Sequence, residues 1–147
     1  MDDRRAGRTV MNGLEQLRTA LGGGRSGIAE LMDITVVELE AGHVVFTLRP
    51  NASMLNPIGT VNGGVAAVLL DSVASCAVHS ALAPGASYST AQLNIHYTRA
   101  ILPDTPYVTG VGDVVHLGRS IGTATGTITD DRDRVVAHGT VTCTIRS

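Results

Sequence analysis

One segment of the sequence, residues 65–82, is so apolar that it dictates much of the fold. Alanine, valine and leucine occupy nearly every side of the helix that this segment predicts, so the helix must be buried all round. The turn pair Pro84 and Gly85 ends it. Such a helix has to be enclosed by other elements, because its apolar surface cannot face water.

Much of the remaining chain consists of β-branched runs separated by turn residues. The stretch ITVVELEAGHVVFTLRP has two such runs around Ala41 and Gly42, which predicts a β-hairpin. Further strands are predicted near residues 88–99, 106–117, 119–130 and 134–146. A hairpin, a long helix and an antiparallel meander, in that order, predict an α+β fold in which the sheet wraps around the helix.

A short segment precedes the hairpin. MNGLEQLRTAL has leucines at positions 14, 17 and 21, and this spacing predicts an amphipathic helix over residues 10–21 that packs outside the hairpin. The three glycines that follow end the helix and are interpreted as a linker, because no Lys-Ser/Thr pair follows them as in a phosphate loop. We therefore expect an N-terminal segment, residues 1–24, and one domain, residues 25–147.

Composition excludes several classes of protein. The 147 residues, 44% of them hydrophobic, suit one domain, and a net charge of −2 with scattered arginines gives no footprint for nucleic acid. No apolar run approaches the length of a membrane span and MDDRRAGRTV lacks the apolar core of a signal peptide, so a cytoplasmic location is expected. All eleven basic residues are arginine, which excludes Schiff-base, PLP and Walker-lysine chemistry.

The cysteines and histidines show no metal-ligand spacing. Cys76 and Cys143 fit no CxxC or zinc pattern, which favours two buried, reduced thiols. His79 is interpreted as a hydrogen-bonded core or interface histidine. The other histidines on predicted strands share no common spacing: His96, His116 and His138. We expect no metal and no cofactor.

A single acid, Asp71, interrupts the apolar helix. A buried carboxylate costs several kcal/mol unless it is paired, hydrogen-bonded or beside a wet cavity. Asp71 lies about two turns beyond the helix start near residue 63, too far to cap the first amides. Two interpretations remain: a structural salt bridge to an arginine, or a carboxylate in a cleft that acts as a base or nucleophile. We prefer the second.

The glycine pair Gly63 and Gly64 stands where this helix begins. A tight turn is its simplest explanation. Glycines at a helix start also leave backbone N–H groups free at the positive end of the helix dipole, with no side chain in the way. These amides could polarise the carbonyl of an ester or thioester, and donors aimed at developing charge are often the largest catalytic contribution.

Together these residues resemble a known family. The pattern N-x-x-G-x-x-[H]-G-G followed by an acid is matched by Asn56, Gly59, Asn62, Gly63, Gly64 and Asp71. It is similar to the hotdog-fold thioesterases of the phenylacetate-degradation, PaaI-like, type. The resemblance runs from about residue 30 to the C-terminus and includes STAQLNIHYTRAI and VVHLGRS. It implies an acyl-CoA thioesterase whose subunits join their sheets, with homo-oligomers of at least a dimer and a homotetramer expected.

The resemblance also implies roles for individual residues. Asp71 would be the catalytic acid, as general base or nucleophile, and the Gly63 N–H would polarise the thioester carbonyl. Asn56 matches an amide near the reacting thioester, and Thr90 matches a hydroxyl that holds the acid or its water, a place that Ser89 could take instead. Asp71 and Thr90 of one chain would face Asn56 and Gly63 of another.

Position 62 departs from the family pattern, because it is Asn62 where histidine is usual. An amide can brace the loop through hydrogen bonds but cannot titrate near neutral pH. The hypotheses are therefore hydrolysis of an acyl-CoA or related thioester, a non-hydrolytic acyl-thioester-binding protein with the same cavity, and, with less support, a hotdog dehydratase or hydratase. Gly64 is a candidate substrate contact, and Arg99 and Arg119 could bind the phosphates of coenzyme A or be solvated surface residues.

Overall fold

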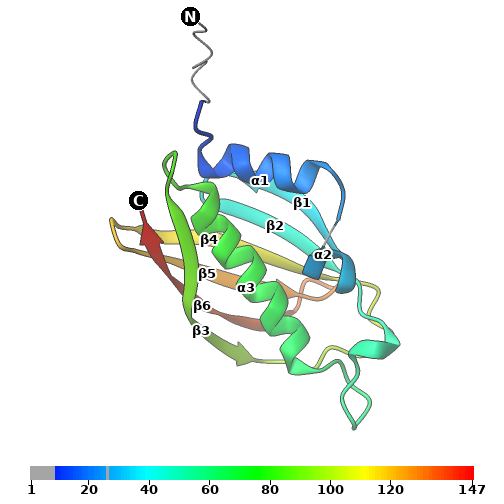
Figure 1. Ribbon diagram of the computed structural model, residues 1–147. Coiled ribbons are helices and arrows are strands. Elements are labelled where there is room, and N and C mark those ends of the chain that lie inside the picture. The colour runs from blue at the N-terminus through cyan, green and yellow to red at the C-terminus, as the bar shows by residue number, and fades with distance from the viewer. Residues whose placement is uncertain (1–8, 26) are drawn as a thin grey trace, which may run out of the picture.

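The long helix α3, Gly63–Ser80, lies across a curved antiparallel sheet in the computed structural model, which describes residues 9–25 and 27–147 (Figure 1). The signal-peptide expectation concerned the first ten residues, of which residues 1–8 lie outside the described part. The strands are β1 Ile34–Glu40, β2 His43–Leu48, β3 Ser87–Tyr97, β4 Val108–Leu117, β5 Ile121–Thr129 and β6 Val135–Arg146. The predicted α+β fold, a sheet wrapped around one helix, is confirmed.

The sheet order is β1-β2-β4-β5-β6-β3, with every neighbouring pair antiparallel. The β1–β2 hairpin and the β4–β5–β6 meander agree with the sequence. The first strand after α3 differs from a simple meander, because β3 crosses to the far side and pairs with β6. This crossover leaves β3 as an edge strand beneath α3.

α3 is held against the sheet by an apolar core. Leu69, Leu70 and Val73 are fully buried, together with the alanines and valine of the next turns. Glycines on the strands allow the close approach: a Cβ at Gly112 would lie 2.1 Å from the Val73 carbonyl oxygen. At 18 residues α3 is long and apolar enough to cross a membrane, contrary to the expectation of no such run, but its burial here is that of a core helix.

Two helices precede the sheet: α1, Gly13–Gly22, and α2, Gly27–Leu31. α1 begins with a capping box in which Asn12 and Glu15 exchange hydrogen bonds of 2.9 and 2.8 Å. It docks on the end of α3, where the Gly13 amide donates to the Leu82 carbonyl at 3.0 Å. The predicted helix is thus present, but it packs mainly on α3 and less on β1, and not outside the hairpin as expected. α2 was not predicted. A short 3-10 turn, Ala52–Met54, precedes the loop into α3.

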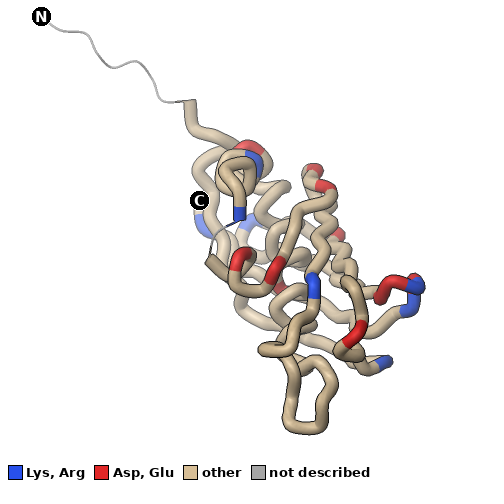
Figure 2. The backbone as a smooth tube through the Cα atoms, turned by 90° about the vertical axis from the view of Figure 1, so that its right-hand side faces the viewer, with Lys and Arg blue, Asp and Glu red and all other residues tan. Residues whose placement is uncertain are grey.

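Charged residues are sparse and of both signs over the fold, as Figure 2 shows. One compact group lies in the turn between β5 and β6, where Asp130 accepts hydrogen bonds from the Arg132 and Arg134 amides and pairs with the Arg134 side chain. The Arg134 contacts lower the pKa of Asp130 against the opposing effect of burial. Asp130 therefore pairs within its own turn and stabilises the connection between β5 and β6.

Candidate functional site

Asp71 and Thr90 meet where the core helix crosses the edge strand. The Thr90 hydroxyl on β3 donates a 2.9 Å hydrogen bond to Asp71 Oδ1 on α3. Ser89 points to the other face of the sheet, where its hydroxyl lies 3.0 Å from that of Thr144. Of the two hydroxyls that the sequence left open, the structure brings Thr90 to the acid.

Neither a salt bridge to an arginine nor a capping role explains Asp71 in the structure. In residues 9–25 and 27–147, no arginine forms an ion pair with this carboxylate. It lies two turns into α3, whose N-cap is Asn62, so it does not cap the helix. Asp71 is half-buried and accepts one hydrogen bond, from the Thr90 hydroxyl. Its carboxylate can therefore accept a further hydrogen bond from a water or a substrate atom.

Asn62 organises the start of α3. Its side-chain oxygen accepts a 2.8 Å hydrogen bond from the Gly64 N–H, and its carbonyl accepts one of 2.9 Å from Val65. The sequence led us to expect both glycine amides to be free. Gly64 differs, because its amide is occupied by the cap, and this leaves it no donor for a substrate.

Gly63 keeps the free amide of the pair. Its N–H has no acceptor among the described residues, as is usual for the first residue of a helix. Its carbonyl accepts a 2.6 Å hydrogen bond from the Tyr97 hydroxyl. A Cβ at this position would lie 3.1–3.3 Å from the Tyr97 ring, so the strand and the helix start are in close contact. The Gly63 N–H itself belongs to the preceding peptide, whose Asn62 carbonyl accepts the bond from the Val65 amide, so this N–H also points from a fixed peptide.

Tyr97 was not among the candidate residues. It lies at the end of β3 on the side that faces α3, the same side as Leu93 and Ile95. The alternation of apolar residues over LNIHY was the available signal for its direction, but nothing in the pattern indicated its bond to Gly63.

Asn56 is used within its own loop. Its side-chain nitrogen donates to the Thr60 hydroxyl at 2.7 Å, and its oxygen accepts from the Ile58 and Thr60 amides at 3.1 Å. These bonds shape the loop that leads into α3, and they do not reach Asp71. Ile58 stands at the tip of this loop, 85% exposed. Asn56 thus supports the loop and makes no contact with the Asp71–Thr90 pair in one chain.

The two candidate phosphate-binding arginines lie on different parts of the fold. Arg99 follows β3 and lines a cavity of about 390 Å³ together with Asn62, Gly63 and Tyr97. Arg119 is in the turn between β4 and β5. Only Arg99 therefore shares a cavity with the free amide of Gly63.

Two further cavities meet at Asp71. One of about 290 Å³ is lined by Gly64, Ala67, Val68, Asp71, Thr90 and Leu93. The other, of about 270 Å³, lies toward the C-terminal half of α3 and contacts Ser72, Ser75 and Cys76 as well as Asp71. Their combined volume falls within the range of ~300–1,000 Å³ that is usual for ligand sites. Asp71 is the one ionisable carboxylate on their walls.

The thiols near this site are unsuited to nucleophilic chemistry. Burial raises the pKa of Cys76 to about 12, and the nearby Asp71 charge adds to the shift. Burial also raises the pKa of Cys143, while Thr90 acts in the opposite direction. Both cysteines are free. Because the thiolate is the reactive form, Asp71 remains the better candidate for the reacting group.

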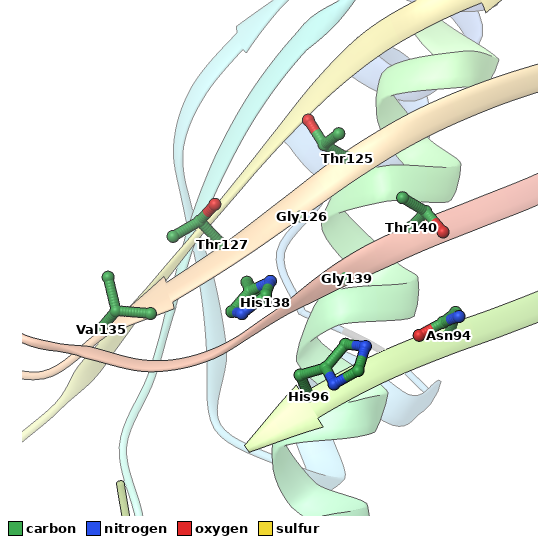
Figure 3. A pocket seen from close by; sticks show the side chains of 9 residues that line it. All are labelled: Asn94, His96, Thr125, Gly126, Thr127, Val135, His138, Gly139 and Thr140. Carbon is green, nitrogen blue, oxygen red and sulfur yellow. The ribbon is translucent and has the colours of Figure 1, made fainter. Parts of the chain in front are cut away.

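The histidines lie away from Asp71. His79 Nε2 is 3.0 Å from Gln16 Oε1 of α1, and burial lowers its pKa, in agreement with the structural role expected for it. His96 and His138 stack at 5.5 Å in a cavity of about 480 Å³ on the outer face of the sheet, opposite α3 (Figure 3). No group of three potential metal ligands occurs within the described part of the chain.

Comparison with known proteins agrees with this architecture. Residues 58–137 match the Thioesterase superfamily. The chain is 23% identical over 120 residues to the 1,4-dihydroxy-2-naphthoyl-CoA hydrolase of Listeria monocytogenes serotype 1/2a (strain 10403S), covering 82% of this chain and 96% of that protein.

Two solved structures extend the comparison. The phenylacetic acid degradation-related protein of Ralstonia eutropha JMP134 has a TM-score of 0.78 at 26% identity, over 90% of this chain and 99% of that one. The hypothetical thioesterase protein of Streptococcus pneumoniae TIGR4, solved with coenzyme A, has a TM-score of 0.70 at 30% identity, over 78% and 86%. The chain belongs to the Thioesterase superfamily, as a hotdog-fold member of the PaaI-like type.

Proposed function

We propose that the protein hydrolyses an acyl-CoA thioester to a free acid and coenzyme A, with the side chain of Asp71 as the catalytic carboxylate. The observation that carries this proposal is the Thr90–Asp71 hydrogen bond at the junction of two cavities. The coenzyme A in the Streptococcus pneumoniae structure and the substrate named for the Listeria relative support CoA as the thiol.

Asp71 has two possible roles in this reaction. As a general base it removes a proton from a water that attacks the thioester carbon. As a nucleophile it attacks the thioester carbon, the carbon–sulfur bond breaks to release the CoA thiolate, and water then hydrolyses the mixed anhydride to the free acid and the Asp71 carboxylate. In either case Thr90 holds one carboxylate oxygen and leaves the other toward the reacting atoms. Gly63 N–H supplies the hydrogen bond to the oxyanion, and the Val65 amide fixes the peptide that carries it by donating to the Asn62 carbonyl.

The spacing of Gly63 and Asp71 favours a site made by two chains. They are eight residues apart on one helix, a separation of about 12 Å along its axis. One thioester carbon cannot lie within about 3 Å of both groups. A second copy of the chain, paired along the exposed edge of β3, could bring its Gly63 and Arg99 to the Asp71 of the first. We therefore propose a homodimer as the minimal active unit.

A non-hydrolytic acyl-thioester-binding protein is the second candidate. The observation that favours it is the neutral Asn62 at the position where the family pattern has histidine, together with the capped Gly64 amide. Both candidates use the same cavities and differ only in turnover. A dehydratase or hydratase has less support, since no histidine pairs with Asp71 among the described residues.

The test is thiol release from short, long and aromatic acyl-CoAs by the wild type and by Asp71→Asn, which keeps the shape and removes the charge. Turnover by the wild type and a loss of at least about a hundredfold in the variant support the proposal. Full activity in a folded Asp71→Asn protein excludes Asp71. Tight binding of acyl-CoA by a wild type without turnover supports the binding protein.

A further inference from the structure

We infer that the cavity of about 270 Å³ beside Asp71 is the acyl subsite, and that helices α1 and α2 form the wall that limits the length of the acyl group. The inference rests on the proposed function, because it assigns a place to the acyl half of that substrate. The two helices of this wall precede the segment matched to the superfamily, residues 58–137.

Asp71 divides one face of α3 into two stretches. Gly64, Ala67 and Val68 line the cavity toward the N-terminal half of the helix. Ser72, Ser75 and Cys76 line the cavity toward its C-terminal half. Residues at these spacings share one side of a helix. A thioester carbon held at Asp71 therefore has one substituent directed into each cavity.

The two cavities differ in how far the fold encloses them, and this decides which substituent enters the C-terminal cavity. The cavity toward the N-terminal half of α3 is lined by α3 and the edge strand β3 alone, and it carries no cation. Apart from Asp71 at its mouth, the residues lining the C-terminal cavity carry no charge, and its remaining walls are largely apolar. They are Leu21, Ile28, Ala29, Ile34, Phe46 and Tyr88.

Coenzyme A carries several phosphate charges, and their burial without cations is strongly unfavourable. The acyl group therefore belongs in the enclosed C-terminal cavity, which α1, α2, β1 and β2 also wall, and the CoA arm belongs at the cavity beside the sheet edge, where its phosphates stay in water.

Tyr88 closes the far end of the cavity. Its ring packs against that of His79, one helical turn beyond Ser75, with 5.0 Å between the ring centroids. Burial raises the pKa of the Tyr88 phenol, while the Ser75 hydroxyl beside it acts in the opposite direction, so the ring stays neutral at physiological pH. His79 is in turn hydrogen-bonded to Gln16 of α1. The end of the cavity is thus a fixed neutral ring.

α1 and α2 cover the cavity from the side. Leu21 lies in the last turn of α1, and Ile28 and Ala29 lie on α2. α1 is anchored by the buried Leu17 and by the Gly13 amide bonded to Leu82. α1 is therefore attached to the C-terminal end of α3, while α2 packs on β1, and the side chains of both helices set the space left for an acyl group.

The experiment compares Ala29→Phe with the wild type over straight-chain acyl-CoAs of increasing length. The new ring fills the cavity, so kcat/KM for the longest accepted acyl group should fall at least about tenfold relative to acetyl-CoA. Glu30→Phe is the matched control, because Glu30 is exposed on the same short helix and does not line the cavity. It should leave the length profile unchanged. Tyr88→Ala, which opens the far end, should extend the profile to longer chains.

A second readout keeps the subsite separate from turnover. Asp71→Asn protein, with and without Ala29→Phe, is titrated with unreactive S-alkyl-CoA thioethers of the same lengths. A length-dependent loss of affinity caused by Ala29→Phe supports the subsite even if the wild type hydrolyses nothing. Equal losses at every length, or none, in both assays overturn it. If the wild type hydrolyses acyl-CoA and Ala29→Phe leaves the dependence of kcat/KM on acyl length unchanged, the inference fails and the proposed function stands.

Discussion

Thr90 on the edge strand β3 donates a 2.9 Å hydrogen bond to Asp71 on the core helix, so the carboxylate is oriented by the strand that follows the helix in the chain. Thr90→Val keeps the shape of the side chain and removes the donor. We expect kcat/KM to fall about tenfold to a hundredfold, the usual worth of a hydrogen bond to a charged group. Thr90→Ser restores the hydroxyl and should recover most of the activity. Equal activities for the valine and serine variants would show that the bond has no catalytic role.

The free N–H of Gly63 can be removed with little change to the helix. Proline is favoured at the first position of a helix, and the extended backbone of Asn62, with φ −59° and ψ 135°, suits the residue before a proline. Gly63→Pro should lower kcat about a hundredfold to a thousandfold, as for the loss of one oxyanion donor.

Gly63→Ala is the control for this variant. It keeps the N–H and introduces the same Cβ, which lies 3.1–3.3 Å from the Tyr97 ring in either case. The catalytic effect of the amide is therefore the difference between the proline and alanine variants. Equal rates in the two would exclude Gly63 as the oxyanion donor.

Asn62 should contribute to stability through its cap. Asn62→Ala removes the acceptor for the Gly64 N–H and should lower the free energy of unfolding by about 1 kcal/mol, measured by chemical denaturation. Asn62→Asp keeps an acceptor and adds a charge that the helix dipole favours, so stability should be retained. The same charge lies beside the proposed oxyanion position, so turnover should fall. An Asn62→Ala protein as stable as the wild type would contradict the capping role.

His43 links three strands on the outer face of the sheet. Its Nδ1 lies 2.6 Å from Asp113 and its Nε2 lies 3.1 Å from Glu38. The hydrogen bond to Asp113 is the main cause that raises the pKa of His43, opposed by burial and helped by Glu38. Because the folded state holds this proton more tightly, the stabilisation is complete below the unfolded pKa of about 6.5 and is lost as the pH rises through the folded pKa.

Two measurements check this pH dependence. NMR titration should give a His43 pKa above 6.5, and Asp113→Asn should lower it. Chemical denaturation at several pH values should show the free energy of unfolding falling above that pH in the wild type. The fall should be smaller in Asp113→Asn. A wild-type pKa at or below 6.5 would contradict the ion pair.

The sequence was sufficient for the elements whose pattern is local. The apolar run predicted α3, the β-branched runs predicted the strands, and the position of Asp71 beyond the helix start marked it as unusual. Long-range pairing was not available from the same patterns. The crossing of β3 to the far edge depends on how the strands pack around α3, and α2 is too short for a periodic signal.

The choice between Ser89 and Thr90 shows the limit most clearly. Extending the alternation back from Leu93 would place Ser89 on the side that faces α3. The register of β3 shifts between Thr90 and Gln92, and this bulge turns Thr90 toward Asp71 instead. One irregular residue, invisible in the pattern, decides which hydroxyl meets the acid.

The two-chain site makes a quantitative prediction for mixed subunits. Asp71→Asn lacks the acid but keeps the Gly63 amide, and Gly63→Pro has the reverse defect. If each site takes Asp71 from one chain and Gly63 from its partner, a mixed dimer has one intact site and one doubly defective site. Random exchange should then restore about one quarter of the wild-type sites.

Exchange is verified beforehand with two differently tagged subunits, and the readout is thiol release from an acyl-CoA that the wild type hydrolyses. Mixing either variant with itself supplies the baseline. Proven exchange without recovery would place Asp71 and the oxyanion donor in one chain, and the oxyanion would then need a donor closer to Asp71 than Gly63, which stands about 12 Å away along the helix.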